Sequence, residues 1–319
     1  MISFVAICLL AWQPLASTGN DQGMWFIGDQ DPTVLNFDAK TKGLDYSICA
    51  RVSTEGYVIL QRLSRRPIDM MVIEETLWFL DYSSSVALYA IRKSGDEHRS
   101  IAQATMQGIL EIDVIPTELV SLRDLVVVGC STESLQVHTF DGHDWKQLPT
   151  LEEPNARLAN HNGTLVAAAP SEQGVHLWSL SDEQWQEGPL VELQGTLYDI
   201  MTKQNWLLFV STKGDKAYIL GLQGTNPIEI ASFDIPKGSW SLVPSPEGIT
   251  VIGVERNGTT SVLDLSWPSG ITNGWVSLQQ DTTNDLSIFE RFPYLMPATV
   301  VLLFFLLMSR RTKAKLNSK

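Results

Sequence analysis

The chain has 319 residues, of which 44% are hydrophobic and 18% charged, and its formal net charge is −13. This apolar content is too high for a disordered protein, and it is spread along the chain rather than gathered into repeated membrane spans. The negative charge argues against non-specific nucleic-acid binding, because phosphate backbones attract basic surfaces.

The start of the sequence, 1–19, predicts a cleaved secretory signal peptide. It carries no charged side chain, and the apolar run 2–12 is followed by the small residues Ala16-Ser17-Thr18-Gly19. An apolar segment of this length is too short to span a bilayer and is typical of a signal. We expect the cut between Ala16 and Gly19.

Short apolar runs recur at a regular interval through the middle of the chain. They start 40 to 53 residues apart, at residues 24–28, 77–80, 125–129, 165–169, 207–210 and 250–254. Apolar runs of four or five residues between turn residues indicate strands that are buried on both faces. Their spacing is the period of propeller blades.

An alternating strand follows four of these runs after a short polar turn. These strands are residues 135–140, 175–178, 216–220 and 260–263. Repeated hairpins of one design, without a sustained helical stripe, predict an all-β fold. We expect a β-propeller over residues 20–286, with six blades, or seven as the alternative.

Further residues recur between blades three and four. A Trp follows the alternating strand in each of them, Trp145 and Trp185, and Arg157 stands in the link between them. Phe140-Asp141, and Phe37-Asp38 earlier in the chain, are aromatic-Asp pairs. On these residues the chain resembles kelch-type β-propellers, such as the central domain of galactose oxidase. In that resemblance Arg157 opens the next blade. The paired glycines of kelch blades are replaced here by Gly129-Cys130 and Ala168-Ala169.

The C-terminal region predicts a membrane anchor. Residues 292–308 are uncharged and strongly apolar, and at about 1.5 Å per residue they span roughly 25 Å as a helix. Residues 287–291 form a linker, and all the charged side chains of the tail, 309–319, are basic. The positive-inside rule then places the tail in the cytoplasm and the acidic propeller outside it, which agrees with the signal peptide.

Two cysteines remain after signal removal, Cys49 and Cys130. They could form a disulfide, but a single pair so widely separated in sequence does not define a framework. Cys130 ends an apolar run, which favours a buried free thiol.

Four of the five histidines fall in one part of the chain, close to two aspartates: His138, His143, His161, His176, Asp141 and Asp144. A metal site would need these side chains to converge on one point. His138 and His176, however, occupy equivalent positions in adjacent blades, which a repeat explains without a function. We therefore interpret them as ordinary strand and turn residues and expect neither a metal nor another cofactor.

Asn162 and Asn257 each begin an Asn-Gly-Thr sequence. This pattern fits an N-glycosylation acceptor, and Asn-Gly is also the preferred two-residue hairpin turn. Both interpretations remain open.

No nucleophile-elbow, zinc-protease or phosphate-loop motif occurs in the sequence, so we predict no catalytic residues. We expect a single-pass, N-out membrane protein whose propeller loops bind protein or glycan ligands. The alternative is a membrane-tethered hydrolase or lyase that acts on polysaccharide through paired carboxylates such as those at 141–144, 152–153 and 182–183. A third possibility is an accessory subunit of a polytopic membrane protein.

Overall fold

The computed structural model describes residues 17–20, 23–28, 46–51, 56–63, 67–73, 76–82, 86–92, 105–111, 115–224, 226–245, 248–255, 259–270 and 274–280. Within these ranges there is no helix of the length and apolar character that a membrane span requires. The predicted anchor, residues 292–308, lies outside them, as do residues 1–16 of the predicted signal peptide.

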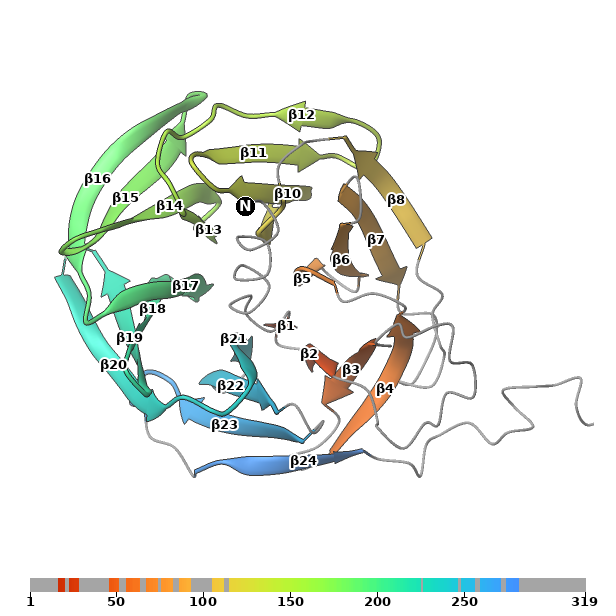
Figure 1. The fold of residues 1–319 in the computed structure, drawn as a ribbon. Helices are drawn as coiled ribbons and strands as arrows, with labels where there is room; N and C mark the ends of the chain where they lie inside the picture. Colours follow the sequence, from red (N-terminus) through yellow and green to blue (C-terminus); the bar gives the residue numbers. More distant parts are fainter. Residues whose placement is uncertain are drawn as a thin grey trace, which may run out of the picture. The chain divides into compact units, whose positions relative to one another are not determined.

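The described residues contain 24 strands, which follow one another as six antiparallel meanders of four strands around a central axis (Figure 1). The first and second meanders are β1 (Ser17–Asn20), β2 (Gly23–Gly28), β3 (Tyr46–Arg51), β4 (Gly56–Leu63), and β5 (Met70–Ile73), β6 (Thr76–Tyr82), β7 (Val86–Arg92), β8 (Thr105–Leu110). The third and fourth are β9 (Glu118–Leu122), β10 (Leu125–Ser131), β11 (Leu135–Phe140), β12 (Trp145–Gln147), and β13 (Arg157–His161), β14 (Thr164–Ser171), β15 (Gly174–Ser181), β16 (Gln184–Glu192). The fifth and sixth are β17 (Thr196–Lys203), β18 (Trp206–Lys213), β19 (Lys216–Gln223), β20 (Asn226–Asp234), and β21 (Ser239–Ser245), β22 (Gly248–Val254), β23 (Thr260–Ser266), β24 (Val276–Gln280).

The first strand of each meander lies nearest the axis, and the fourth lies at the rim (Figure 1). Neighbouring first strands contact one another around the axis, including β1 with both β5 and β21. This radial arrangement of small antiparallel sheets confirms the predicted all-β propeller.

The predicted count of six separate blades is not what the sheets show. Counted by hydrogen bonding, the described strands form five sheets, four of four strands and one of eight. The large sheet combines the first and sixth meanders, because β24 pairs in parallel with β4 through Gln279↔Gly56 and Gln280↔Tyr57. No seventh set of strands occurs in the described part of the chain.

The strand assignments from the sequence agree with the structure. All six apolar runs become second strands, β2, β6, β10, β14, β18 and β22, and the four alternating segments become third strands. The middle of each second strand is apolar because it lies within its sheet and packs against a neighbouring meander on each face. β1 begins at Ser17, within the range 1–19 expected for the signal peptide.

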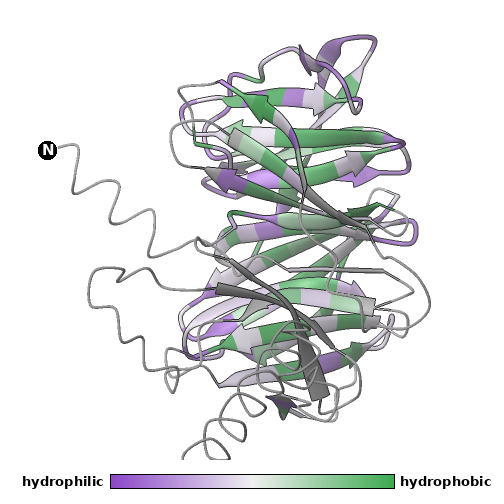
Figure 2. Ribbon diagram, turned by 90° about the vertical axis from the view of Figure 1, so that its right-hand side faces the viewer, coloured by the Kyte–Doolittle hydropathy of each residue, from purple (hydrophilic) through white to green (hydrophobic). Residues whose placement is uncertain are grey.

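The core lies between meanders rather than within one layer. Each of the five apolar clusters joins neighbouring meanders, and the cluster containing Phe26 draws on the first, second and sixth. Figure 2 shows the hydrophobic residues along the strands and many hydrophilic ones at the turns. Apolar packing therefore joins the two ends of the chain's propeller, in addition to the β24–β4 pairing.

Candidate functional site

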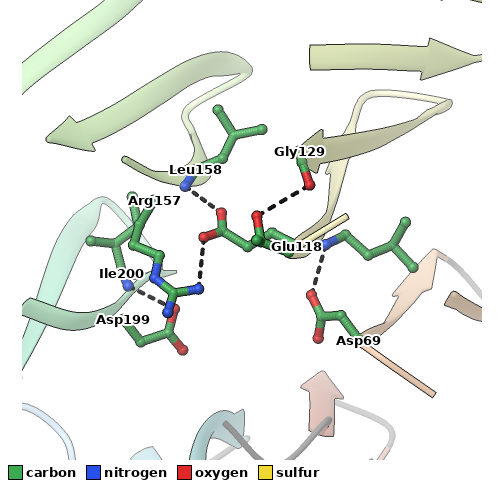
Figure 3. A network of polar contacts seen from close by, with 9 residues as sticks. Asp69, Glu118, Gly129, Arg157, Leu158, Asp199 and Ile200 are labelled. Atoms are coloured by element: carbon green, nitrogen blue, oxygen red, sulfur yellow. Dashed lines mark hydrogen bonds and ion pairs between the residues drawn. The ribbon is translucent and has the colours of Figure 1, made fainter. Parts of the chain in front are cut away.

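Four charged side chains occupy one equivalent position near the axis. Asp69, Glu118, Arg157 and Asp199 each lie seven residues before the first residue of a second strand. Glu118, Arg157 and Asp199 lie on the first strands β9, β13 and β17, and Asp69 directly precedes β5. Figure 3 shows the four side chains together. We call these four residues the axial cluster.

Asp69 joins the second meander to the third. Its Oδ2 accepts a hydrogen bond from the backbone N–H of Leu119 at 2.7 Å, and its Oδ1 accepts one from Met70 N–H at 2.8 Å. Asp69 is half-buried, and these two donors replace water at its carboxyl group.

Glu118 makes the corresponding connection between the third and fourth meanders. Its Oε2 accepts the backbone N–H of Leu158, and its Oε1 lies 3.1 Å from Nη1 of Arg157 (Figure 3). Glu118 is only 6% exposed, whereas Arg157 is partly buried. Hydrogen bonds that an ionised carboxylate accepts from a guanidinium and from a backbone N–H are stronger than hydrogen bonds between neutral groups.

Asp199 completes the axial cluster from the fifth meander. Its Oδ1 accepts the backbone N–H of Ile200 at 2.8 Å, and its charge acts on both Arg157 and Glu118. Other side chains connect the fifth meander to the sixth. The Tyr198 hydroxyl donates to the Trp240 carbonyl at 2.6 Å, and Lys203 Nζ donates to the Ser245 carbonyl.

Burial dominates the electrostatics of the axial cluster. Desolvation raises the pKa of Glu118 to about 7, although Arg157 acts in the opposite direction. Burial also raises the pKa of Asp69 well above its ordinary value, and that of Asp199 in the same direction. The neighbouring carboxylates raise the pKa of Arg157 despite its own burial, so the guanidinium stays charged.

The structure separates the four histidines. His138 lies on β11, His161 on β13 and His176 on β15, and His143 stands in the turn between β11 and β12. Among the described residues, no three His, Cys, Asp or Glu side chains come close enough to hold a metal ion.

The equivalence of His138 and His176 is wrong. His138 pairs with Val128, the fourth residue of β10, whereas His176 pairs with Ala169, the sixth residue of β14. The register counterpart of His138 is Trp178, because the turns after these two second strands differ in length. His138 is buried, and desolvation lowers its pKa.

Two of the acidic stretches that the sequence offered as paired carboxylates, 141–144 and 182–183, lie in turns and make local or exposed contacts. Asp141 Oδ1 accepts the backbone N–H groups of His143 and Asp144 at 2.9 and 2.8 Å, which closes the turn. Glu183 makes an exposed ion pair with Lys146 at 2.8 Å. Neither belongs to the axial cluster.

Cys130 is buried on β10 as a free cysteine. Burial raises the pKa of its thiol to about 12, so it is not a thiolate near neutrality. The side chain of Cys49 lies outside the described residues.

Asn162 is exposed at the turn between β13 and β14, with a φ of 53°, followed by Gly163 with a φ of 79°. This is the hairpin geometry that Asn-Gly favours. Accessibility is also compatible with glycosylation, which therefore stays a prediction. Asn257 lies outside the described residues.

A small cleft lies between the fourth and fifth meanders. Its volume is about 220 Å³, and most of its lining is apolar, including Leu177, Leu207 and Leu222, with His161 at one side. None of the axial carboxylates lines this cleft.

Sequence reasoning named Arg157 but missed its three acidic partners. They are isolated in sequence, between residues 69 and 199, and only the ring brings them together. One feature of the sequence could have identified them: each lies seven residues before the first residue of the second strand of its meander.

No protein-family model matches the chain, and no curated protein matches it either. The kelch-type resemblance therefore stays a prediction.

Several solved structures share the fold. TolB from Acinetobacter baumannii aligns with a TM-score of 0.57 at 10% identity, over 82% of this chain and 65% of the TolB chain. The fucose-specific lectin from Aleuria aurantia aligns with a TM-score of 0.55 at 11% identity, over 83% and 94% of the two chains. A chain from a nidogen/laminin complex gives 0.53 at 11% identity, over 85% and 94%.

At such low identity these likenesses show the fold alone. This chain is thus similar in architecture to known propellers, and its four axial charges, Asp69, Glu118, Arg157 and Asp199, hold neighbouring meanders together in that architecture.

Proposed function

We propose that the chain is a single-pass membrane protein whose propeller binds protein or glycan ligands on the non-cytoplasmic side. The signal peptide and the C-terminal span support this topology from the sequence. The structural observation that carries the binding function is the exposed apolar surface on the outer strand β8.

Met106 and Ile109 of β8 are 55% and 49% exposed. They pair with Tyr89 and Ala87, which are two residues apart on β7, so both project from the same face of the sheet. Large apolar side chains that stay exposed together are typical of interaction surfaces. Methionine is also among the residues enriched in the cores of such interfaces.

The position of β8 adds backbone groups to this surface. β8 is the last strand of its four-stranded sheet, so one edge has no strand partner among the described residues. A partner can add a strand to such an edge while its side chains contact Met106 and Ile109. The lectin and the nidogen/laminin complex show that similar propellers occur among binding proteins.

The test is photo-crosslinking from Met106 in the full-length, membrane-embedded chain. A photoreactive residue at Met106 is expected to capture a partner, whereas the same residue at the exposed turn position Glu133 is not. Binding of that partner, once purified, should fall at least tenfold in the double variant Met106→Asp, Ile109→Asp. Equal capture from both positions, or unchanged binding by the double variant, would refute the proposed surface.

The axial cluster favours a second candidate, a membrane-tethered hydrolase or lyase for polysaccharide. The axial cluster contains three carboxyl groups from different meanders, and Glu118 has a pKa near neutrality, as a general acid requires. Their engagement with backbone amides argues for a structural role instead. Release of reducing ends from a polysaccharide panel, lost in Glu118→Gln but retained in Glu133→Gln, would establish the enzyme.

A further inference from the structure

Three of the fourth strands carry residues that protect an open sheet edge. Such an edge can pair with another chain, and charged side chains, prolines and short strand length hinder that pairing. β16 contains two glutamates and a proline, and β20 contains a proline, a glutamate and an aspartate. β12 has only three residues, one of them Lys146. The outer edges of these three strands have no strand partner in the described part of the chain.

Two other fourth strands, β8 and β24, contain neither a charged residue nor a proline. The outer edge of β24 is paired, because it joins β4 in parallel at Gln279↔Gly56 and Gln280↔Tyr57. An unprotected edge of this chain is therefore one that pairs with another outer strand. β8 has the same uncharged composition, but its outer edge has no strand partner among the described residues.

β8 also exposes more large apolar side chains than the protected strands. Met106 and Ile109 are 55% and 49% exposed and lie on one face of the sheet. In the described structure β16 and β20 each expose one such residue, Leu190 at 39% and Ile228 at 48%. An unprotected edge with two exposed apolar residues is the place where this propeller is best suited to accept a strand.

The strand that fits this edge is β8 of a second copy. When two β8 strands lie antiparallel across a two-fold axis, one register places Met106 of each copy opposite Ile109 of the other, so that the four apolar side chains meet. The strand is uncharged, so the two edges meet without like-charge repulsion, although the whole chain has a net charge of −13. The contact repeats between copies what β24 and β4 make within one chain, an edge-to-edge pairing of two outer strands.

We propose that the partner at β8 is a second copy of this chain, and that the two copies pair through β8 across a two-fold axis. The sheet of the second meander then grows from four strands to eight. One pair of six-residue strands buries less area than a standard interface, so the dimer depends on the high local concentration that a shared membrane provides. This inference rests on the proposed function, because it names the partner of the surface on β8.

The first experiment is disulfide crosslinking in membranes that contain two tagged forms of the full chain. One form carries Met106→Cys and the other Ile109→Cys, with copper phenanthroline as the oxidant. We expect a bridge between positions 106 and 109 of different copies, identified by mass spectrometry. Its yield should be at least ten times that of the control pair Leu190→Cys and Ile228→Cys, which are exposed on the protected strands. Equal yields from the two pairs would overturn the inference.

The second experiment adds a charge to the edge. Energy transfer between donor-labelled and acceptor-labelled copies of the full chain in lipid vesicles measures their association. Ile109→Glu should lower the associated fraction at least tenfold, because each copy then places a carboxylate in the apolar contact. The control Ile228→Glu makes the same change on β20 and should leave association unchanged. Should Ile109→Glu fail to fold, Met106→Lys gives the same test, and association that survives the charge would overturn the inference.

Photo-crosslinking from Met106 separates this inference from the proposed function. A product with the mass of two chains supports both. Capture of a different protein alone would overturn the pairing of two copies but leave the binding surface on β8, whereas no capture from Met106 would overturn both.

Discussion

At the scale of single residues, the carboxylates of the axial cluster form hydrogen bonds between meanders but lose contact with water. Asp69 and Glu118 each receive a backbone N–H from the next meander, so they join strands that no ladder pairs. Ionised carboxylates nevertheless lose solvation at the axis, and this loss raises the pKa values of Asp69 and Glu118. The cluster therefore specifies how meanders meet while making the fold sensitive to pH.

The stability of the propeller should fall as the pH rises from about 4.5 to 7. The pKa of Glu118 is about 7 in the folded protein against an ordinary value of 4.5, so the folded state holds this proton more tightly than the unfolded state. The stability so gained is fully present below pH 4.5 and is lost as the pH rises through 7, at a cost on the order of 3 kcal/mol. Asp69 and Asp199 act in the same direction.

Urea unfolding of the full chain at a series of pH values measures this effect. Glu118→Gln mimics the protonated side chain and should flatten the pH dependence in this window, whereas Glu133→Gln, at an exposed turn, should not. A free energy of unfolding that rises from pH 5 to 7 in the parent would contradict the prediction.

Removing the one cation of the axial cluster should be costly. Arg157→Met leaves Glu118 and Asp199 without their positive partner, and we expect a loss of about 3 kcal/mol in the free energy of unfolding at neutral pH. The matched control is Lys146→Met, which breaks an exposed ion pair with Glu183 and should leave stability nearly unchanged. Equal effects of the two variants would show that burial does not decide the strength of these pairs.

At the scale of elements, each meander is a hydrophobic second strand flanked by strands with other duties. In four meanders the first strand or the residue directly before it carries the axial charge, and the fourth strand β16 contacts the preceding meander. Trp185 at the start of β16 illustrates this contact, since its Nε1 donates to the carbonyl of Pro149 in the preceding meander at 2.8 Å. The corresponding Trp145 of β12 has a buried Nε1 without a hydrogen-bond partner in the described structure.

These two tryptophans provide a matched comparison. Trp185→Phe loses the bond to Pro149 and leaves that carbonyl without its donor, so it should cost about 1 kcal/mol more than Trp145→Phe. The loss of ring area is the same in both, and Trp145→Phe removes an N–H that has no acceptor. Thermal or urea unfolding of the two variants measures the difference, and a larger cost for Trp145→Phe would contradict it.

At the scale of the whole molecule, closure of the ring brings distant segments together. The first and sixth meanders share an apolar cluster and also the short parallel pairing of β24 with β4. An edge-to-edge contact of this kind covers strand edges that would otherwise be open to pairing. It also means that the first and last parts of the propeller must fold together.

The proposed anchor makes a prediction for the full chain. The parent should remain with membranes after alkaline carbonate extraction. The double variant Leu303→Lys, Phe304→Lys should be released, because a Lys at the centre of a span costs about 3 kcal/mol on insertion. The control Leu278→Lys changes an apolar residue of β24 instead and should not release the chain. Release of the parent itself would refute the span.

The sequence by itself determined the features that depend on local pattern. Apolar runs such as 125–129 and 207–210 are continuous in the chain, so their burial as second strands could be predicted, and so could the hairpins and the propeller class. The Asn-Gly turn at Asn162 followed from backbone preference alone.

Only the tertiary structure decided what depends on closure of the ring. Asp69, Glu118 and Asp199 resemble ordinary surface acids in sequence, because nothing local shows that the ring brings them together near the axis. The first and sixth meanders likewise form one sheet only because β4 and β24, from the two ends of the propeller, pair at Gly56 and Gln279. Local sequence encodes the conformation of a strand, whereas contacts between remote strands arise from the way all the meanders pack together.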